Sequence, residues 1–79
     1  MEYIAIIEKD PDRDFGASFP DFPGCITAGR TPEEAKEMAR EALRGHIALM
    51  REMREPVPEP STFDHVMSDP RFRDGAAFF

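Results

Sequence analysis

Residues 19–35 of the chain read FPDFPGCITAGRTPEEA, and this stretch decides the fold. Its first part holds two prolines and a glycine within residues 20–24, a composition that favours a rigid corner. Residues 25–29 form a short run that favours a strand and ends at a glycine. Thr31 is followed at once by a proline and, three residues later, by Glu34, which is the pattern of a helix start. The stretch therefore predicts a corner, a strand and the first turn of a helix in direct succession.

Two further strands are expected before this corner. Residues 3–8, YIAIIE, are rich in β-branched and aromatic side chains and predict a strand with a buried centre. In residues 15–19, Phe15, Ala17 and Phe19 alternate with Gly16 and Ser18, so both aromatic rings fall on one face of a second strand. The intervening residues 9–14, KDPDRD, have the composition of a turn. We therefore expect an antiparallel β-meander with strands at residues 3–8, 15–19 and 25–29.

One long amphipathic helix should follow the meander. Its apolar residues recur at helical spacing and occupy one half of the helix surface. They are Ala35, Met38, Ala39, Ala42, Leu43, His46, Ile47, Leu49, Met50 and Met53, with His46 included for its position. We expect the helix to cover residues 32–54 and to pack on the sheet. Gly45 interrupts it, and because glycine weakens a helix, it indicates close packing or a slight bend there.

The last part of the chain begins with a stiff connector. Residues 55–60, EPVPEP, cannot continue the helix, because proline lacks a backbone donor and restricts the residue before it. Within residues 61–79 we expect a short helix and a short final strand. Phe78 and Phe79 end the chain, which indicates a fourth strand that is cut short or completed by another subunit, and we take both as oligomer contacts. The predicted class is α+β, in the order β-β-β-α-β.

Composition indicates one small folded domain, residues 1–79, and favours a particular kind of partner. The chain is 41% hydrophobic and has a formal net charge of −6, which disfavours binding to nucleic acid and favours a basic partner. It has no apolar run of the roughly 20 residues that a membrane span needs, and no basic leader. We expect a cytoplasmic protein whose single cysteine, Cys25, is a small core residue. So small a domain gains burial by association, so we expect a homo-oligomer, a dimer or tetramer.

Four aspartates are the candidate functional residues. Asp10, Asp12 and Asp14 alternate as in a calcium loop, but the glycine and glutamate that such a loop needs are missing, and a solvated turn fits better. Together with Asp21 they suggest a magnesium-dependent nuclease, although residues on a loop and a corner are poorly placed for that chemistry. As a binding surface, the same carboxylates would steer and orient a basic protein.

Two other features have a structural and a functional interpretation. The corner at residues 21–24 is either a tight structural turn, which we favour, or an exposed tip at which Phe22 contacts a partner. His46 lies on the apolar side of the helix and fits a core or interface residue better than a general base, because no orienting partner is evident. We therefore predict no catalytic residue, no metal and no cofactor.

The chain resembles the HicB antitoxin family. The resemblance rests on FPDFPGC at residues 19–25, TPEEA at residues 31–35 and PVPEPS at residues 56–61, in this order and at these spacings. It implies a degenerate RNase H-like fold without nuclease chemistry. It also implies a partner, a HicA-like toxin, which is a small basic ribonuclease that cleaves messenger RNA and whose active-site surface the antitoxin covers. Many family members carry a DNA-binding segment after this domain, whereas this chain stops at Phe79, so we expect no direct binding to nucleic acid.

The leading hypothesis is an antitoxin that binds and occludes a basic mRNA-cleaving toxin. Two alternatives stay open at this point: a residual metal-dependent nuclease of RNase H-like fold, and an orphan homo-oligomeric module. The residues proposed to contact the partner are Asp10, Asp12, Asp14, Asp21 and Phe22.

Overall fold

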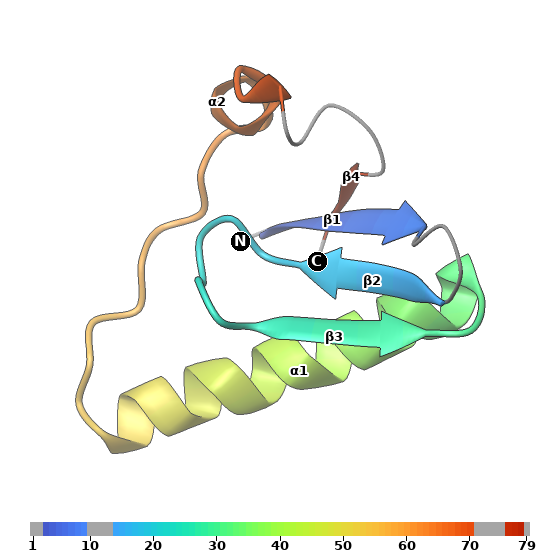
Figure 1. Cartoon of the computed structure of the whole chain (residues 1–79). Coiled ribbons are helices and arrows are strands. Elements are labelled where there is room, and N and C mark those ends of the chain that lie inside the picture. The colour runs from blue at the N-terminus through green and yellow to red at the C-terminus, as the bar shows by residue number, and fades with distance from the viewer. Residues whose placement is uncertain (1–2, 10–13, 71–75, 79) are drawn as a thin grey trace.

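The computed structural model describes residues 3–9, 14–70 and 76–78, and it belongs to the α+β class (Figure 1). Its elements in chain order are β1 (Ile4–Lys9), β2 (Phe15–Ser18), β3 (Ile26–Gly29), α1 (Pro32–Glu52), α2 (Phe63–Met67) and β4 (Ala76–Phe78). The three antiparallel strands and the long helix lie where the sequence predicts them, with bounds that differ by one or two residues. No helix in the described part of the chain is long and apolar enough to cross a membrane.

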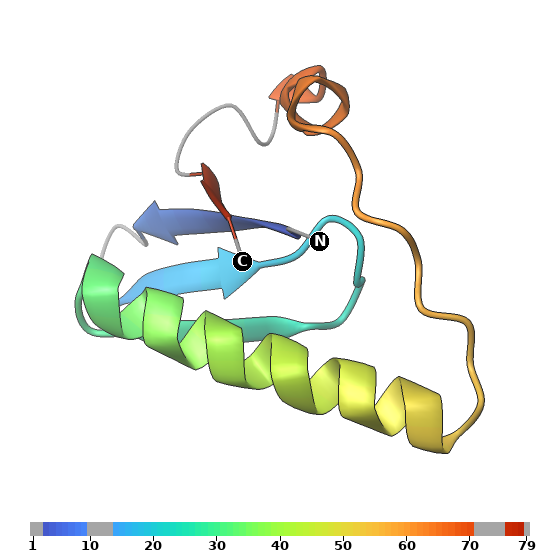
Figure 2. The same cartoon turned by 180° about the vertical axis from the view of Figure 1, so that it is seen from behind.

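The strands form an antiparallel sheet in the order β3-β2-β1-β4. Ile6 lies opposite Ser18, which in turn lies opposite Ile26, so these three residues share one face of the sheet. The other face is covered by α1, which runs across it as a single rod (Figure 2). β4 pairs with β1 of the same chain through residues 76–78, and Phe79 lies outside the described residues.

The main core lies between α1 and the sheet. Its buried members come from all parts of the first 43 residues: Tyr3, Ala5, Ala17, Phe19, Phe22, Cys25, Ala39 and Leu43. The two alanines at the centre of the α1 contact, Ala35 and Ala39, are fully buried, and their small side chains let the helix axis approach the sheet closely. Cys25 is buried here as a small core residue, as the sequence predicts.

A second, smaller core lies on the opposite face of the sheet. Ile4 and Ile6 project from β1 and pack against Val66 and Met67 of α2. In Figure 1, α2 lies above β1, away from β2 and β3. The face of the sheet opposite α1 is therefore covered by α2 near β1, while residues of β3 on that face, such as Ile26, are exposed.

The junction between β3 and α1 depends on two local features. Thr31 caps the helix, because its Oγ1 accepts a hydrogen bond from the backbone N of Glu34 at 3.0 Å. The Oε1 of Glu34 accepts a hydrogen bond from the backbone N of Arg30 at 3.3 Å. In a standard capping box the donor is the backbone N of the capping residue, here Thr31, which is one residue later. At Gly29, an added Cβ would lie 2.4 Å from the backbone N of Ala35, so the strand passes against the helix at a distance that only glycine permits.

The helix α1 ends two residues earlier than predicted. Arg54 has a φ of 59°, in the left-handed region, which a continuing right-handed helix cannot contain. The backbone N of Glu55 donates to the carbonyl of Met50 at 2.8 Å and satisfies one of the last carbonyls of the helix. This closure turns the chain into the proline-rich connector.

Candidate partner-binding surface

The predicted acidic residues do not form one cluster. Asp14 is exposed and immediately precedes β2, whereas Asp21 follows β2 and is half-buried; Asp10 and Asp12 lie outside the described residues. The four residues of β2 separate Asp14 from Asp21, and each residue of a strand adds roughly 3.3 Å. Carboxylates that share a pair of catalytic metal ions must lie closer together, because such ions are only about 4 Å apart. Within residues 3–9, 14–70 and 76–78, no group of three or more histidines, cysteines, aspartates or glutamates could hold a metal ion. A nuclease site that uses both Asp14 and Asp21 is therefore incompatible with this geometry.

Asp21 has a structural role inside the chain. Its Oδ2 accepts a hydrogen bond from the backbone N of Ser61 at 2.9 Å, and its Oδ1 accepts one from the Ser61 hydroxyl at 2.5 Å. These bonds join the corner after β2 to the end of the proline-rich connector, 40 residues later in the sequence. Because both of its oxygens already bind Ser61, Asp21 serves first to hold the connector. Its contact with a partner stays a prediction.

The interpretation of Phe22 as an exposed tip is wrong. Only 2% of the Phe22 side chain is exposed, and its ring packs edge-on against Tyr3 at 4.8 Å and His46 at 5.5 Å between ring centroids. The corner is held by hydrogen bonds from the backbone N of Phe22 to Phe19 and from that of Cys25 to Phe22. The chain folds Phe22 inward because its aromatic ring gains more by joining the core than by facing water. The tight structural turn is the alternative that the structure supports.

Burial also explains the state of the polar side chains around this corner. The Tyr3 hydroxyl donates a hydrogen bond to the carbonyl of Pro58, which ties the connector to β1. Burial, together with the negative charges of Glu59 and Asp21, raises the pKa of Tyr3. Burial also raises the pKa of the Cys25 thiol, so this cysteine stays protonated and is a poor nucleophile. The corner supplies packing and hydrogen bonds, not reactive groups.

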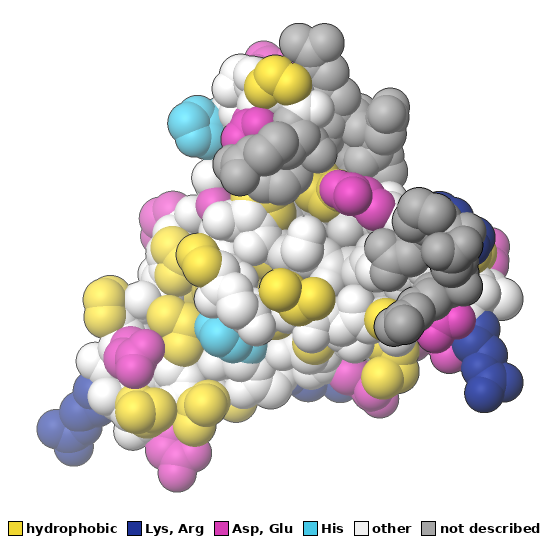
Figure 3. Space-filling view, in the orientation of Figure 1, with side chains coloured by type: hydrophobic (Ala, Val, Ile, Leu, Met, Phe, Trp, Pro, Cys, Tyr) yellow, Lys and Arg dark blue, Asp and Glu magenta, His cyan; other side chains and the backbone are white. Residues whose placement is uncertain are grey.

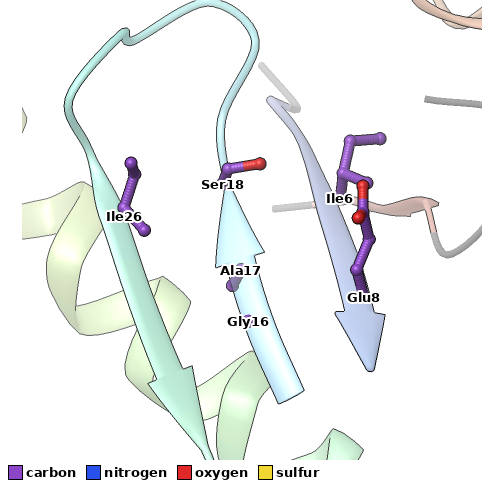
Figure 4. Close-up of a pocket in the computed structure, with 6 residues that line it drawn as sticks. All are labelled: Ile6, Glu8, Gly16, Ala17, Ser18 and Ile26. Atoms are coloured by element: carbon purple, nitrogen blue, oxygen red, sulfur yellow. The ribbon is translucent and has the colours of Figure 1, made fainter. Parts of the chain in front are cut away.

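A shallow hollow lies on the sheet face opposite α1. It has a volume of about 240 Å³ and is lined by Ile6, Glu8, Gly16, Ala17, Ser18 and Ile26 (Figure 4). Small residues of β2 form its floor, and Ile26, which is 71% exposed, stands at its β3 side. Such a surface can receive a side chain of a protein partner, since it combines apolar area with a carboxylate at Glu8. The hollow was not predicted from the sequence, where its signal is the run of small residues at positions 16–18.

The helix α1 exposes more apolar surface than the sequence predicts. Met38, Leu49 and Met53 were placed on the packed half of the helix, yet they are 40%, 53% and 61% exposed. The buried residues of this helix are Ala35, Ala39 and Leu43. They cover a narrower arc than the apolar half of the helix, because a flat sheet contacts only a narrow strip along a cylindrical helix. These exposed side chains form a second candidate contact surface.

Gly45 lies in this exposed part of α1, and the expectation of close packing around it is wrong. The side of the helix at this position is exposed, and apart from its chain neighbours and the nearby backbone of the helix itself, no described atom lies within 4 Å of the place that a Cβ would take. A glycine in a helix interior costs about 1 kcal/mol relative to alanine.

Comparison with known sequences places these features in a family. The family of HicB-like antitoxins of bacterial toxin-antitoxin systems matches residues 3–79. A UPF0150 protein of Thermoplasma acidophilum is 38% identical over 58 residues, which cover 73% of this chain and 84% of that protein. Antitoxin HicB 1 of Photorhabdus laumondii is 38% identical over 60 residues, which cover 76% of this chain and 39% of that protein. The chain thus corresponds to less than half the length of this antitoxin.

Solved structures agree with the sequence match. The N-terminal domain of the Burkholderia pseudomallei antitoxin HicB superposes with a TM-score of 0.77 at 30% identity, covering 100% of this chain and 93% of that one. A chain of the HicA3 and HicB3 toxin-antitoxin complex superposes with a TM-score of 0.76 at 30% identity, with the same coverage. The Photorhabdus laumondii and Burkholderia pseudomallei relatives are HicB antitoxins. From its sequence and its fold, this chain belongs to the HicB-like antitoxin family of bacterial toxin-antitoxin systems.

Proposed function

We propose that this chain is the antitoxin of a HicA/HicB-type pair, which binds a small basic mRNA-cleaving toxin and covers its RNA-binding and catalytic surface. The observation that carries the proposal is the family match over residues 3–79. It is supported by the structural likeness, over the whole chain, to a chain of the HicA3 and HicB3 complex. The protein acts by binding and is not an enzyme.

The charge of the chain supports a basic toxin as the partner. The formal net charge is −6, and opposite charge on two proteins accelerates their encounter and orients it. In this proposal the aspartates around the turn between β1 and β2, namely Asp10, Asp12 and Asp14, steer the toxin toward the antitoxin. The same charge repels the phosphates of nucleic acid, so this chain does not itself bind DNA or RNA.

Several finer features belong to the same proposal. Residues 1–79 act as a single domain of degenerate RNase H-like fold, with β4 as its last strand. The domain works in the cytoplasm. It assembles as a dimer or tetramer, with Phe78 and Phe79 at the contact between subunits, because so small a domain gains stability from the burial that association adds.

Co-expression with the small basic protein encoded beside this chain tests the proposal. The neighbouring protein alone should arrest growth, this chain should restore growth, and the two should co-purify as one complex. A neighbour that is harmless by itself, or the absence of a complex, would refute the antitoxin function and favour an orphan module. The matched control is an unrelated acidic protein of similar size, which should not restore growth.

Charge reversal of the turn residues tests electrostatic steering. Changing Asp10, Asp12 and Asp14 to lysine should lower the association rate with the toxin by about tenfold or more at low salt, and should weaken its salt dependence. The control is Asp64→Lys, which reverses an exposed charge on α2. Stopped-flow or biolayer measurements across a salt series give the rates. If the triple variant associates as fast as the wild type, steering by this turn is excluded, although the antitoxin function can stand.

A further inference from the structure

One side of α1 carries an apolar stripe whose large side chains are exposed, while Ala42 within it is half-buried and packs against the main core. At about 100° per residue, five residues fall within an arc of roughly 80° beside the packed face. They are Met38, Ala42, Gly45, Leu49 and Met53, and we call this set the α1 stripe. Its three large side chains are 40–61% exposed. In Figure 3 hydrophobic side chains lie along the edge of the molecule where α1 runs, with acidic side chains among them. An exposed apolar stripe of this kind marks an interaction surface.

The margin of α1 that lies beside the stripe and away from the sheet carries acidic side chains. Three exposed glutamates stand three or four residues from a member of the α1 stripe and so lie beside it, on the side away from the sheet. They are Glu34, Glu41 and Glu52. The exposed cations lie beyond the opposite margin of the packed face. They are Lys36, Arg40, Arg44 and Arg51, and they share this side with Glu33 and Glu37, of which Glu37 pairs with Arg40 at 2.7 Å. The α1 stripe therefore has a negative flank, which complements a basic surface.

Gly45 gives the α1 stripe a notch near its middle. Residue 45 is exposed, and beyond its chain neighbours and the nearby backbone of α1 no described atom approaches the place of its missing Cβ within 4 Å. Ala42, one turn earlier, adds only a methyl group. Met38 and Leu49, about 16 Å apart along the helix, stand on either side of this low point. A partner side chain or backbone can thus approach the helix at Gly45 more closely than at any larger residue.

We propose that the α1 stripe is the surface on which this antitoxin docks its basic toxin, an inference that rests on the function proposed above. Apolar side chains of the toxin seat at Ala42 and Gly45, between Met38 and Leu49, while its cations meet the glutamate flank. A second copy of this chain fits less well. Two copies packed antiparallel along the α1 stripe bring their glutamates to the same side, where like charges repel.

The test uses Gly45→Trp, which fills the notch without a clash inside the chain. The indole should weaken binding of the toxin, obtained as the co-purified neighbouring protein, by at least about tenfold, and should abolish growth rescue. Glu41→Lys should weaken binding and reduce its salt dependence. The matched control is Arg44→Glu, which changes the residue next to the notch on the cationic side and should leave binding within about twofold. Far-UV circular dichroism checks that each variant folds, and Leu49→Asp replaces Gly45→Trp if that variant does not.

The outcomes separate the inference from the function on which it rests. If the wild-type chain binds the toxin and the folded Gly45→Trp or Leu49→Asp variant binds it equally well, the α1 stripe is not the docking surface, and the antitoxin function stands. If the wild-type chain does not bind the toxin, both proposals fail. If the substitution changes the mass of the free protein in solution but not its affinity for the toxin, the α1 stripe joins copies of this chain, and the inference is wrong.

Discussion

Gly29→Ala tests the closest approach between a strand and a helix in this fold. An added Cβ would lie 2.4 Å from the backbone N of Ala35 and 2.7 Å from the carbonyl carbon of Glu34. Ordinary contact begins near 3.4 Å, so the end of β3 and the first turn of α1 must separate by about an ångström. Both atoms belong to the backbone, so no side chain can rotate to make room.

The cost of this separation follows from what it disturbs. Inserting a carbon into a packed contact costs about 1–3 kcal/mol, and here we expect about 3 kcal/mol, because the clash meets backbone at the junction that seats Ala35 and Ala39 in the core. For a domain of this size, each kcal/mol lowers the melting temperature by roughly 4–8 °C. Gly29→Ala should therefore lower it by about 12–24 °C.

Thermal unfolding followed by far-UV circular dichroism gives the answer, with Gly45→Ala as the matched control. The same substitution at Gly45 meets open space on an exposed helix side, so it should stabilise the protein by up to about 1 kcal/mol and raise the melting temperature. If glycine-to-alanine substitution lowers the melting temperature at residue 29 and raises it at residue 45, the cost of the backbone clash is separated from the gain in helix propensity. A Gly29→Ala variant that melts within about 3 °C of the wild type would refute the close junction.

The remaining predictions concern the corner and the connector. Asp21→Asn removes the negative charge from the group that accepts the hydrogen bonds of Ser61. It should lower the free energy of unfolding, measured in urea, by about 1–2 kcal/mol, and residues 55–60 should be cleaved faster by a protease. A variant as stable as the wild type would contradict the anchoring role. Burial raises the pKa of Tyr3 above 10.0, so the unfolded chain loses this proton first, and the free energy of unfolding should fall as the pH rises above about 10. Tyr3→Phe should remove this fall in the free energy of unfolding above a pH of about 10. If the variant loses stability with pH as steeply as the wild type, Tyr3 is not its source. The Cys25 thiol should react with a thiol reagent at pH 8 only after denaturant is added, since it is buried and its pKa is raised; rapid labelling of the native protein would show otherwise.

Local chemistry in the sequence determined the elements of this protein. Thr31, with proline after it, predicted the start of α1 at the observed residue, because a cap satisfies a backbone donor of its own first turn. The turns and the alternation of side chains likewise predicted three strands, since both act over a few neighbouring residues. The motifs around the corner and the helix start also predicted the family, which the sequence match and the fold confirm.

Tertiary contacts decided the features that bear on binding. Phe22 points inward because Tyr3 and His46 meet it from two other elements, and no local pattern shows that. Asp21 is an anchor because a residue 40 positions later comes to it. The sheet covers only part of the apolar half of α1, so Met38, Leu49 and Met53 stay exposed although they have the same hydrophobic spacing as the buried residues. Spacing along a helix tells which residues share a side, but only the shape of the opposing surface decides how much of that side it buries.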